Sequence, residues 1–342
     1  MMAAVLYGKE SLQIEPVSVP KIGPDDVLVR VRAALTCGTD VKVFRRGYHA
    51  RMIVPPALFG HELAGDVVAV GENVMKFAVG QRVVSANSAP CGRCFYCVRN
   101  KENLCEDLLF NNGAYAEFIR IPNRIVRKNL YAIPDHISYQ DAALIEPLAC
   151  VMRGLEECDL HGVESIAVIG LGPIGLMFVR LAKVFGVRVI ALGRRKSQLD
   201  RAARMGATDL LCTSDPMDHA AAVREISGGR GVDVAIEAVG TPETWQLAAR
   251  TVRRGGVVNF FGGCPSDSAV ALDTSLLHYS EITCKASFHH TPGHIQKALQ
   301  AVSRGDIAAR DFVNREEPLS NLLDVMRHLM SHNGHMKTAI IP

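Results

Sequence analysis

Two kinds of hydrophobic pattern divide the chain along its length. The first third contains short runs of β-branched residues broken by glycine and proline, at residues 27–35, 65–71 and 80–86. Such runs are typical of strands in a compact β-rich unit. From about residue 165 the pattern changes, because apolar runs at residues 165–170 and 187–193 alternate with amphipathic helical stretches. That alternation predicts βαβ units and a parallel sheet.

The alternation continues before the pattern changes a last time near residue 288. We expect further buried strands at residues 232–240 and 255–263. Two helical stretches at residues 294–305 and 321–333 follow, and a short strand at residues 338–342 ends the sequence. The middle of the chain is therefore expected to be a continuous α/β domain, with the two ends folding together.

These elements group into two domains. Residues 1–150 are expected to form a β-rich catalytic domain and residues 151–287 a doubly wound, parallel-sheet domain, with residues 288–342 returning to complete the first. A formal net charge of +3 is too small to indicate nucleic acid or a membrane as partner. The first residues lack the apolar core of a signal peptide, so we expect a cytoplasmic protein.

Four of the ten cysteines fall close together, and their spacing indicates a metal site. Two, two and seven residues separate Cys91, Cys94, Cys97 and Cys105, so four thiolates can converge on one tetrahedral zinc ion. Such a site has no open position and stabilises the fold. The alternatives are buried or disulfide-bonded cysteines, which seldom cluster so tightly, and an iron–sulfur cluster, whose known spacings differ.

A second set of metal-ligand residues precedes this cluster. Cys37 lies in Thr-Cys-Gly-Thr-Asp, and His61 and Glu62 lie in Phe-Gly-His-Glu-Leu-Ala-Gly. Each ligand type suits zinc. With the four cysteines, this arrangement resembles the zinc-dependent medium-chain dehydrogenase/reductase family, in particular its sorbitol, threonine and polyol dehydrogenase branch. The resemblance covers essentially the whole chain and implies a GroES-like catalytic domain beside a Rossmann domain.

The resemblance also implies a role for each residue of the catalytic zinc site. Cys37 and His61 match the family's constant ligands, Glu62 is a ligand in the polyol branch, and Asp40 matches the carboxylate that orients the histidine. Glu146 falls where other branches place a cysteine ligand. Cys37 and Glu62 already balance the two charges of the ion. We therefore expect Glu146 to lie outside the ligand set in the reactive state, although either glutamate could bind.

Residues around the zinc site are expected to handle the substrate. Thr39 matches the hydroxyl that takes the alcohol proton. Lys42 stands where the family often has a histidine that passes the proton onward, so the usual relay is in doubt. His289 and His290 match a family segment that lines the polyol site, and the basic residues 44–51 could attract an anionic substrate or form a solvated loop.

The cofactor site is predicted by a glycine-rich turn between a strand and a helix. This context permits the tight turn and the approach of a pyrophosphate to the helix N-terminus. The residues of the turn that are expected to bind the cofactor are Gly170, Gly172, Pro173, Ile174 and Gly175.

The end of the second strand predicts which cofactor binds. NAD-binding proteins place an acidic residue about twenty positions after the glycine-rich turn, but Gly193 occupies that position here. Arg194, Arg195 and Lys196 follow it and could bind a 2′-phosphate. We therefore expect NADP(H) rather than NAD(H).

Together these features predict an enzyme with two zinc ions per chain. It would transfer hydride between NADP(H) and a secondary hydroxyl or ketone of a polyol, sugar or related small molecule. The alternatives are an NAD-dependent dehydrogenase of simple alcohols or amino-alcohols, and a non-catalytic nucleotide-binding protein of the same fold. Neither nucleic acid nor membrane is an expected partner, and the resemblance implies a homo-oligomer, either a tetramer or a dimer.

Overall fold

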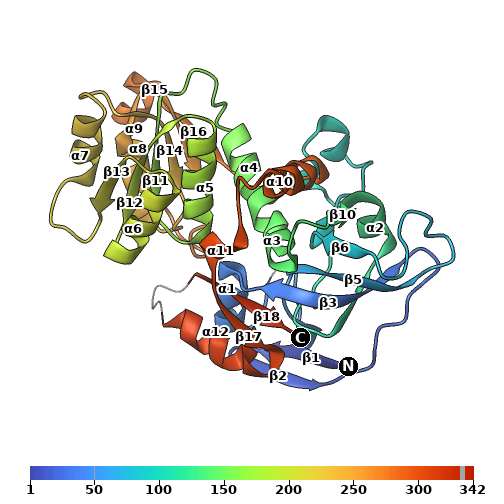
Figure 1. Ribbon diagram of the computed structural model, residues 1–342. Helices are drawn as coiled ribbons and strands as arrows, with labels where there is room; N and C mark the ends of the chain where they lie inside the picture. Colours follow the sequence, from blue (N-terminus) through green and yellow to red (C-terminus); the bar gives the residue numbers. More distant parts are fainter. Residues whose placement is uncertain (50, 332–335) are drawn as a thin grey trace. The chain divides into compact units, whose positions relative to one another are not determined.

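Strands from both ends of the chain lie side by side in the main sheet of the β-rich unit. This computed structural model describes residues 1–49, 51–331 and 336–342, and the unit comprises Met1–Ala149 and His290–Pro342. The sheet has the order β10–β6–β5–β3–β18–β17, and β9 also pairs with β3 (Figure 1). Its strands are β3 (Val27–Leu35), β5 (Glu62–Val70), β6 (Arg82–Ser85), β9 (Phe118–Ile121), β10 (Leu130–Ala132), β17 (Val313–Pro318) and β18 (Lys337–Ile341).

Two smaller sheets and several helices complete this unit. The order β2–β1–β4 forms one sheet, and β7 and β8 form the other. The strands are β1 (Met2–Gly8), β2 (Ser11–Pro16), β4 (Ala57–Leu58), β7 (Ser88–Ala89) and β8 (Leu109–Phe110). The helices are α1 (Gly38–Arg46), α2 (Asn123–Asn129), α3 (Tyr139–Ala143), α4 (Ile145–Glu156, which continues past Ala149), α10 (Pro292–Arg304), α11 (Ala309–Phe312) and α12 (Leu322–Met330), with 3₁₀ turns at Cys97–Arg99, Glu102–Leu104 and Leu319–Asn321.

The second unit, Cys150–His289, contains a six-stranded sheet of order β13–β12–β11–β14–β15–β16, in which every pair is parallel. Helices α5 and α6 pack together, as do α7 and α8, and helices lie on both faces of the sheet (Figure 1). This order is that of a doubly wound dinucleotide-binding fold. Its elements are β11 (Ser165–Ile169), α5 (Pro173–Val184), β12 (Arg188–Gly193), α6 (Lys196–Met205), β13 (Asp209–Cys212), α7 (His219–Ile226), β14 (Val232–Glu237), α8 (Pro242–Thr251), β15 (Val252–Phe260), α9 (Thr274–Tyr279) and β16 (Thr283–Ala286).

Helix α1 has strong signals at both ends, and these fix the loop that carries Cys37. The Cys37 sulfur accepts a hydrogen bond from the backbone N–H of Thr39, and Asp40 accepts one from the N–H of Cys37, forming a capping box. Gly47 ends the helix at φ 93°. A side chain there would lie 2.4 Å from the backbone nitrogen of Lys9, so this position requires glycine.

The α/β fold expected from the hydrophobic pattern is confirmed. Strand β3 coincides with the expected strand 27–35, and β12 lies within the expected run 187–193. Helix α5 lies between the two expected runs at 165–170 and 187–193, where a helical stretch was expected. The pattern did not indicate β13 and β16, because each has only four residues and little apolar alternation. The helix expected at residues 321–333 ends at Met330, and residues 332 and 333 lie outside the described part of the chain.

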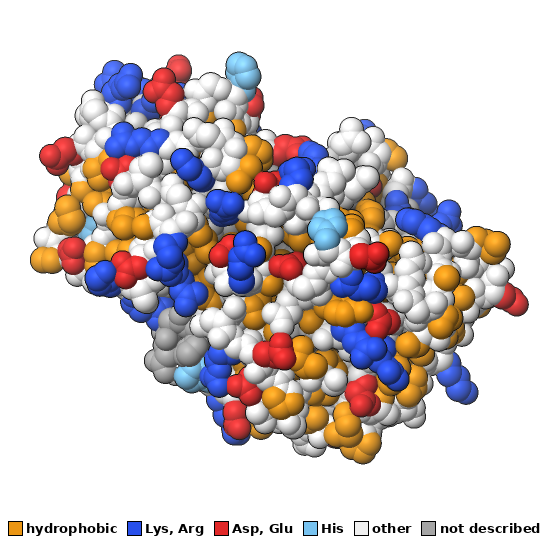
Figure 2. Space-filling view, viewed as in Figure 1, with side chains coloured by type: hydrophobic (Ala, Val, Ile, Leu, Met, Phe, Trp, Pro, Cys, Tyr) orange, Lys and Arg blue, Asp and Glu red, His pale blue; other side chains and the backbone are white. Residues whose placement is uncertain are grey.

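Charged side chains of both signs are mixed on the face of the molecule shown in Figure 2, as a net charge of +3 would suggest. Among the helices of residues 1–49, 51–331 and 336–342, none combines the length and apolar character needed to span a bilayer.

Candidate active site and zinc centres

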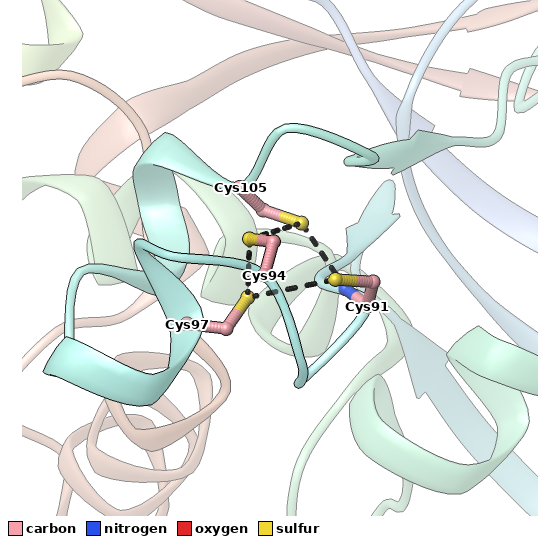
Figure 3. Close-up of side chains that lie close together, drawn as sticks. All are labelled: Cys91, Cys94, Cys97 and Cys105. Atoms are coloured by element: carbon pink, nitrogen blue, oxygen red, sulfur yellow. Dashed lines mark hydrogen bonds between the residues drawn. The ribbon is translucent and has the colours of Figure 1, made fainter.

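The four clustered cysteines converge as a zinc centre requires. Their sulfurs point toward one another (Figure 3), with Cys94 Sγ 3.5 Å from Cys97 Sγ and 3.9 Å from Cys105 Sγ, and Cys91 Sγ 3.9 Å from Cys97 Sγ. Zinc–sulfur bonds of about 2.3 Å in a tetrahedron would place the sulfurs about 3.8 Å apart. A disulfide would need about 2.05 Å. The donor set therefore fits one zinc ion.

The surroundings of these thiols also favour a bound cation. Backbone N–H groups of Glu106 and Cys97 lower the pKa of Cys94 to about 6, whereas burial raises the pKa of Cys97 to about 12. The backbone N–H of Cys91 also donates to the sulfur of Cys105, at 3.2 Å. All four groups can be thiolates together at neutral pH only if a dication balances their charge.

Strand pairing brings the second ligand set together. Leu35 at the end of β3 pairs with Glu62 at the start of β5, so the turn that carries Cys37 lies beside the His61–Glu62 pair. The ligand atoms of Cys37, His61 and Glu62 all lie within 4.8 Å of one another. One thiol, one imidazole and one carboxylate at this spacing could hold a zinc ion.

A buried carboxylate orients the histidine of this set. Asp40 Oδ1 lies 2.9 Å from His61 Nδ1, so Nδ1 carries the proton and Nε2 is left to bind a metal. Asp40 Oδ2 accepts from the backbone N–H of Cys37 at 3.1 Å and lies 2.6 Å from the hydroxyl of Tyr115. Burial favours a neutral His61 ring, but Asp40 and Cys37 outweigh it and raise the His61 pKa. Sequence reasoning missed Tyr115, which lies 75 positions after Asp40.

The carboxylate of Glu62 is engaged by a lysine that sequence reasoning also missed. Lys337 Nζ lies 2.7 Å from Glu62 Oε1 and 2.6 Å from Oε2, and both side chains are buried. Burial lowers the pKa of Lys337, but Glu62 and Cys37 outweigh it and raise that pKa, so the ammonium stays protonated. The one available signal was a lysine at the head of an otherwise apolar strand, Lys-Thr-Ala-Ile-Ile.

Glu146 is a second buried carboxylate of the same unit. Burial raises its pKa to about 7, with Glu62 adding to the effect and His61 opposing it. His290 Nε2 lies 3.6 Å from Glu146 Oε1 and 3.3 Å from Asn87 Oδ1. His290 is only 2% exposed, and these two polar neighbours lie beside its ring inside the fold.

The remaining expected substrate residues are more exposed. Thr39, at the start of α1, is half-buried, and Lys42 on the same helix is exposed. His289 is half-buried with φ 66°, and its ring lies 5.6 Å from that of Phe288. In the basic stretch 44–51, Ala50 lies outside the described residues.

The glycine-rich turn has the shape that a dinucleotide needs. Gly170 follows β11 at φ 95°, and Gly172 caps α5, with Pro173 in its first turn. A side chain at Gly175 would lie 1.7 Å from the carbonyl oxygen of Gly170, so glycine allows the helix to pack against the turn. Nothing lies within 4 Å of the space that a side chain at Gly172 would fill, so a pyrophosphate can approach the helix N-terminus there.

The end of β12 carries the residues expected to select the cofactor. Gly193 is buried, and Arg194 beside it is exposed. Lys196 is paired with Asp200 at 2.9 Å on the surface of α6. A side chain at Gly193 would meet Leu171 Cδ1 at 2.7 Å, so a larger residue there requires Leu171 to move.

Two family models match the chain. The one described as the alcohol dehydrogenase GroES-like domain matches residues 23–135, and the one described as zinc-binding dehydrogenase matches residues 173–304. The first range holds both sets of zinc-ligand residues apart from Glu146, and the second holds the last three residues of the glycine-rich turn, 173–175, and residues 193–196.

Individual proteins extend the similarity to the whole chain. Sorbitol dehydrogenase of Bacillus subtilis (strain 168) is 33% identical over 350 aligned residues, covering 100% of this chain and 97% of its own. A structure assigned to a zinc-binding dehydrogenase of Sinorhizobium meliloti 1021, bound to NADP, has a TM-score of 0.91 and 30% identity and covers 100% of this chain and 99% of that chain. A short chain alcohol dehydrogenase from Escherichia coli CFT073, complexed with NADH, has a TM-score of 0.89 at 23% identity, covers the two chains to 100% and 99%, and shows the fold alone. Similarity therefore does not choose between the two cofactors.

Proposed function

The chain belongs to the zinc-containing medium-chain alcohol dehydrogenase family, and from this premise we propose that it transfers hydride between NADP(H) and a secondary hydroxyl or ketone of a polyol, sugar or related small molecule. The observation that carries the proposal is the convergence of Cys37, His61 and Glu62 within 4.8 Å, with His61 oriented by Asp40. A nucleotide-binding protein without catalysis would have no need of such a set.

The proposed mechanism assigns a task to each residue near the metal set. Cys37, His61 and Glu62 would hold the catalytic zinc, which would supply a Lewis acid for the substrate oxygen, and the nicotinamide would carry the hydride. Asp40 keeps the His61 proton on Nδ1. Thr39 Oγ1 would take the proton from the substrate hydroxyl. Because Cys37 caps α1, Thr39 lies in the first turn of that helix, two positions after Cys37.

Residues at the end of β12 support NADP(H) as the cofactor. Gly193 places no carboxylate where a ribose 2′-hydroxyl would bind, so this position would not repel a 2′-phosphate. Arg194 is exposed, and no hydrogen bond or ion pair of its guanidinium is found among the residues that the structure describes. We propose that Arg194 and Arg195, whose guanidinium groups can bind a phosphate in bidentate fashion, bind the 2′-phosphate. Lys196 is paired with Asp200.

The test is a screen of polyols, sugars, sugar phosphates and their ketones with each oxidised and reduced cofactor. We expect kcat/KM to be highest for a substrate with a secondary hydroxyl and higher with NADP⁺ than with NAD⁺. Metal analysis should find two zinc ions per chain. A preference for NAD⁺ would refute the cofactor proposal. A content of one zinc ion per chain would refute the proposed catalytic zinc site.

A designed reversal of cofactor preference probes the same proposal. Gly193→Asp should favour NAD⁺, because the carboxylate would accept from the ribose hydroxyl and repel the phosphate. Since Leu171 occupies the space beside Gly193, we expect Gly193→Asp with Leu171→Ala to reverse the preference more completely than Gly193→Asp alone. Leu171→Ala by itself is the control, and it should leave the preference for NADP⁺ in place.

A further inference from the structure

Lys337 makes a full set of hydrogen bonds inside the β-rich unit. Its ammonium has three protons, and three acceptors surround it: both oxygens of Glu62, at 2.6 and 2.7 Å, and the carbonyl oxygen of Thr36, at 3.0 Å. The Lys337 residue is 3% exposed, and Glu62 is fully buried. A charged pair this deep in the protein is held in one geometry, because neither partner can turn to water.

The strand pairing around Lys337 fixes where this ammonium lies. Strand β18 begins at Lys337 and runs antiparallel to the end of β3, with Ala339 opposite Leu35. The backbone N–H of Thr338 donates to Thr36 Oγ1 at 2.8 Å, and the backbone N–H of Thr36 donates to the carbonyl of Thr338 at 3.0 Å. Lys337 therefore holds the residue just before Cys37 as well as the glutamate beside His61.

The charges of the candidate site give this contact a consequence. Cys37 as a thiolate and Glu62 as a carboxylate would balance the two positive charges of a zinc ion. Lys337 adds one positive charge in direct contact with Glu62, so the site as a whole, with the ion and these three side chains, would carry a net charge of about +1. An ammonium that binds both oxygens of a carboxylate partly neutralises the negative charge that would otherwise attract a metal ion.

We propose that Lys337 is a positioning residue of the catalytic metal site. It binds both oxygens of Glu62, limits how strongly that carboxylate can bind the cation, and so preserves the cation's attraction for a substrate oxygen. The extra positive charge would also allow Glu146 to approach the cation without making the site anionic. This inference rests on the proposed function, since it presumes a zinc ion at Cys37 and His61.

The competing explanation is that Lys337 only stabilises the pairing of β18 with β3. The two explanations predict opposite changes in metal release. If Lys337 only supports the fold, its removal should loosen the site and release zinc faster. If Lys337 competes with the cation for Glu62, its removal should free the carboxylate for the metal and release zinc more slowly.

A double-mutant cycle on the full-length, zinc-loaded protein separates the two explanations. The variants are Lys337→Met, Glu62→Gln and the double variant. The readout is the rate at which the catalytic zinc passes to a coloured chelator. We expect release to slow by about tenfold in Lys337→Met and to quicken by about tenfold in Glu62→Gln, the lower end of the about 10- to 100-fold range typical of residues that hydrogen-bond a metal ligand. The double variant should release zinc within about threefold of the Glu62→Gln rate, because Lys337 has no carboxylate to compete for once Glu62 is replaced. Cobalt-substituted Lys337→Met should also show altered absorption bands, since Glu62 would bind the metal more directly.

Two further variants guard against a simple loss of folding. Lys337→Arg keeps the charge and should release zinc within about threefold of the wild-type rate. Lys285→Met removes a half-buried lysine whose ammonium meets only the carbonyl of Glu157, at 2.6 Å, among the contacts described, and it should leave zinc release unchanged. If Lys337→Met does not fold, the double variant, which leaves neither member of the buried pair charged, still tests the coupling: release much slower or much faster than in Glu62→Gln would show that Lys337 does not act through Glu62.

The outcomes distinguish this inference from the proposed function. A wild-type protein that holds one zinc ion per chain would refute the metal site itself. A wild-type protein with two zinc ions, in which Lys337→Met releases the catalytic ion as fast as or faster than wild type, would refute the role of Lys337 alone.

Discussion

Replacing Asp40 by asparagine would test how the catalytic histidine is held. The change keeps the shape of the side chain but exchanges one acceptor oxygen for an NH₂ donor. In one orientation the NH₂ faces His61 Nδ1, so the ring must move its proton to Nε2, where a metal would bind. In the other it faces the backbone N–H of Cys37 and the hydroxyl of Tyr115. Neither orientation satisfies all three donors.

The size of the effect follows from these contacts. Losing one hydrogen bond to a buried charged group costs about 1.5–3 kcal/mol, which corresponds to about 10- to 150-fold in an equilibrium constant. We therefore expect Asp40→Asn to bind the catalytic zinc about 10- to 150-fold more weakly. After dialysis against a chelator, metal analysis should find about one zinc per chain, because the four-cysteine centre keeps its ion. The kcat/KM for the best substrate should fall in parallel.

A matched control isolates the role of the carboxylate. Tyr115→Phe removes one of the donors to Asp40 and leaves its charge and its contact with His61 in place. It should reduce zinc affinity by about tenfold or less. An Asp40→Asn protein that keeps two zinc ions and the wild-type kcat/KM would show that Asp40 does not orient His61.

Three other changes address the remaining parts of the site. Cys94→Ser should remove the structural zinc and lower the Tm, and metal analysis should still find the catalytic zinc; retention of both ions would contradict the four-cysteine centre. Arg194→Ala should raise the KM for NADPH by about 10- to 100-fold with little effect on the KM for NADH. The control, Lys196→Ala, should change neither KM value much. If both variants raise the KM for NADPH equally, Arg194 has no special role in binding the phosphate. Thr39→Ala should lower kcat by about 100-fold or more, and Thr39→Ser should recover most of it; steady-state kinetics that separate kcat from KM will show whether the hydroxyl takes the proton.

Local patterns predicted most of the elements and much of the site. The apolar run of β3, the glycine-rich turn before α5 and the cysteine spacing each depend on residues close together in sequence. Their geometry follows from strand alternation, helix capping and tetrahedral coordination. For the same reason Cys37, His61 and Glu62 could be singled out, since each lies in a short motif.

Contacts between distant segments could not be predicted in this way. Lys337 lies 275 positions from Glu62, and the register of β18 against β3 is what joins them. Tyr115 is fully buried beside Asp40, but an isolated tyrosine gives no sign of its partner. His290 was expected to line the substrate site, and its burial against Asn87 became apparent only once the fold was known.

The antiparallel pairing of β18 with β3 has a consequence for biosynthesis. Lys337 leaves the ribosome long after Glu62, and at about 5–20 residues per second the intervening 275 positions take roughly 15–55 s to translate. Throughout that interval the nascent polypeptide carries Cys37, His61 and Glu62 without the ammonium that neutralises the glutamate. The metal set therefore acquires its final charge balance only after β18 has been translated and docks against β3.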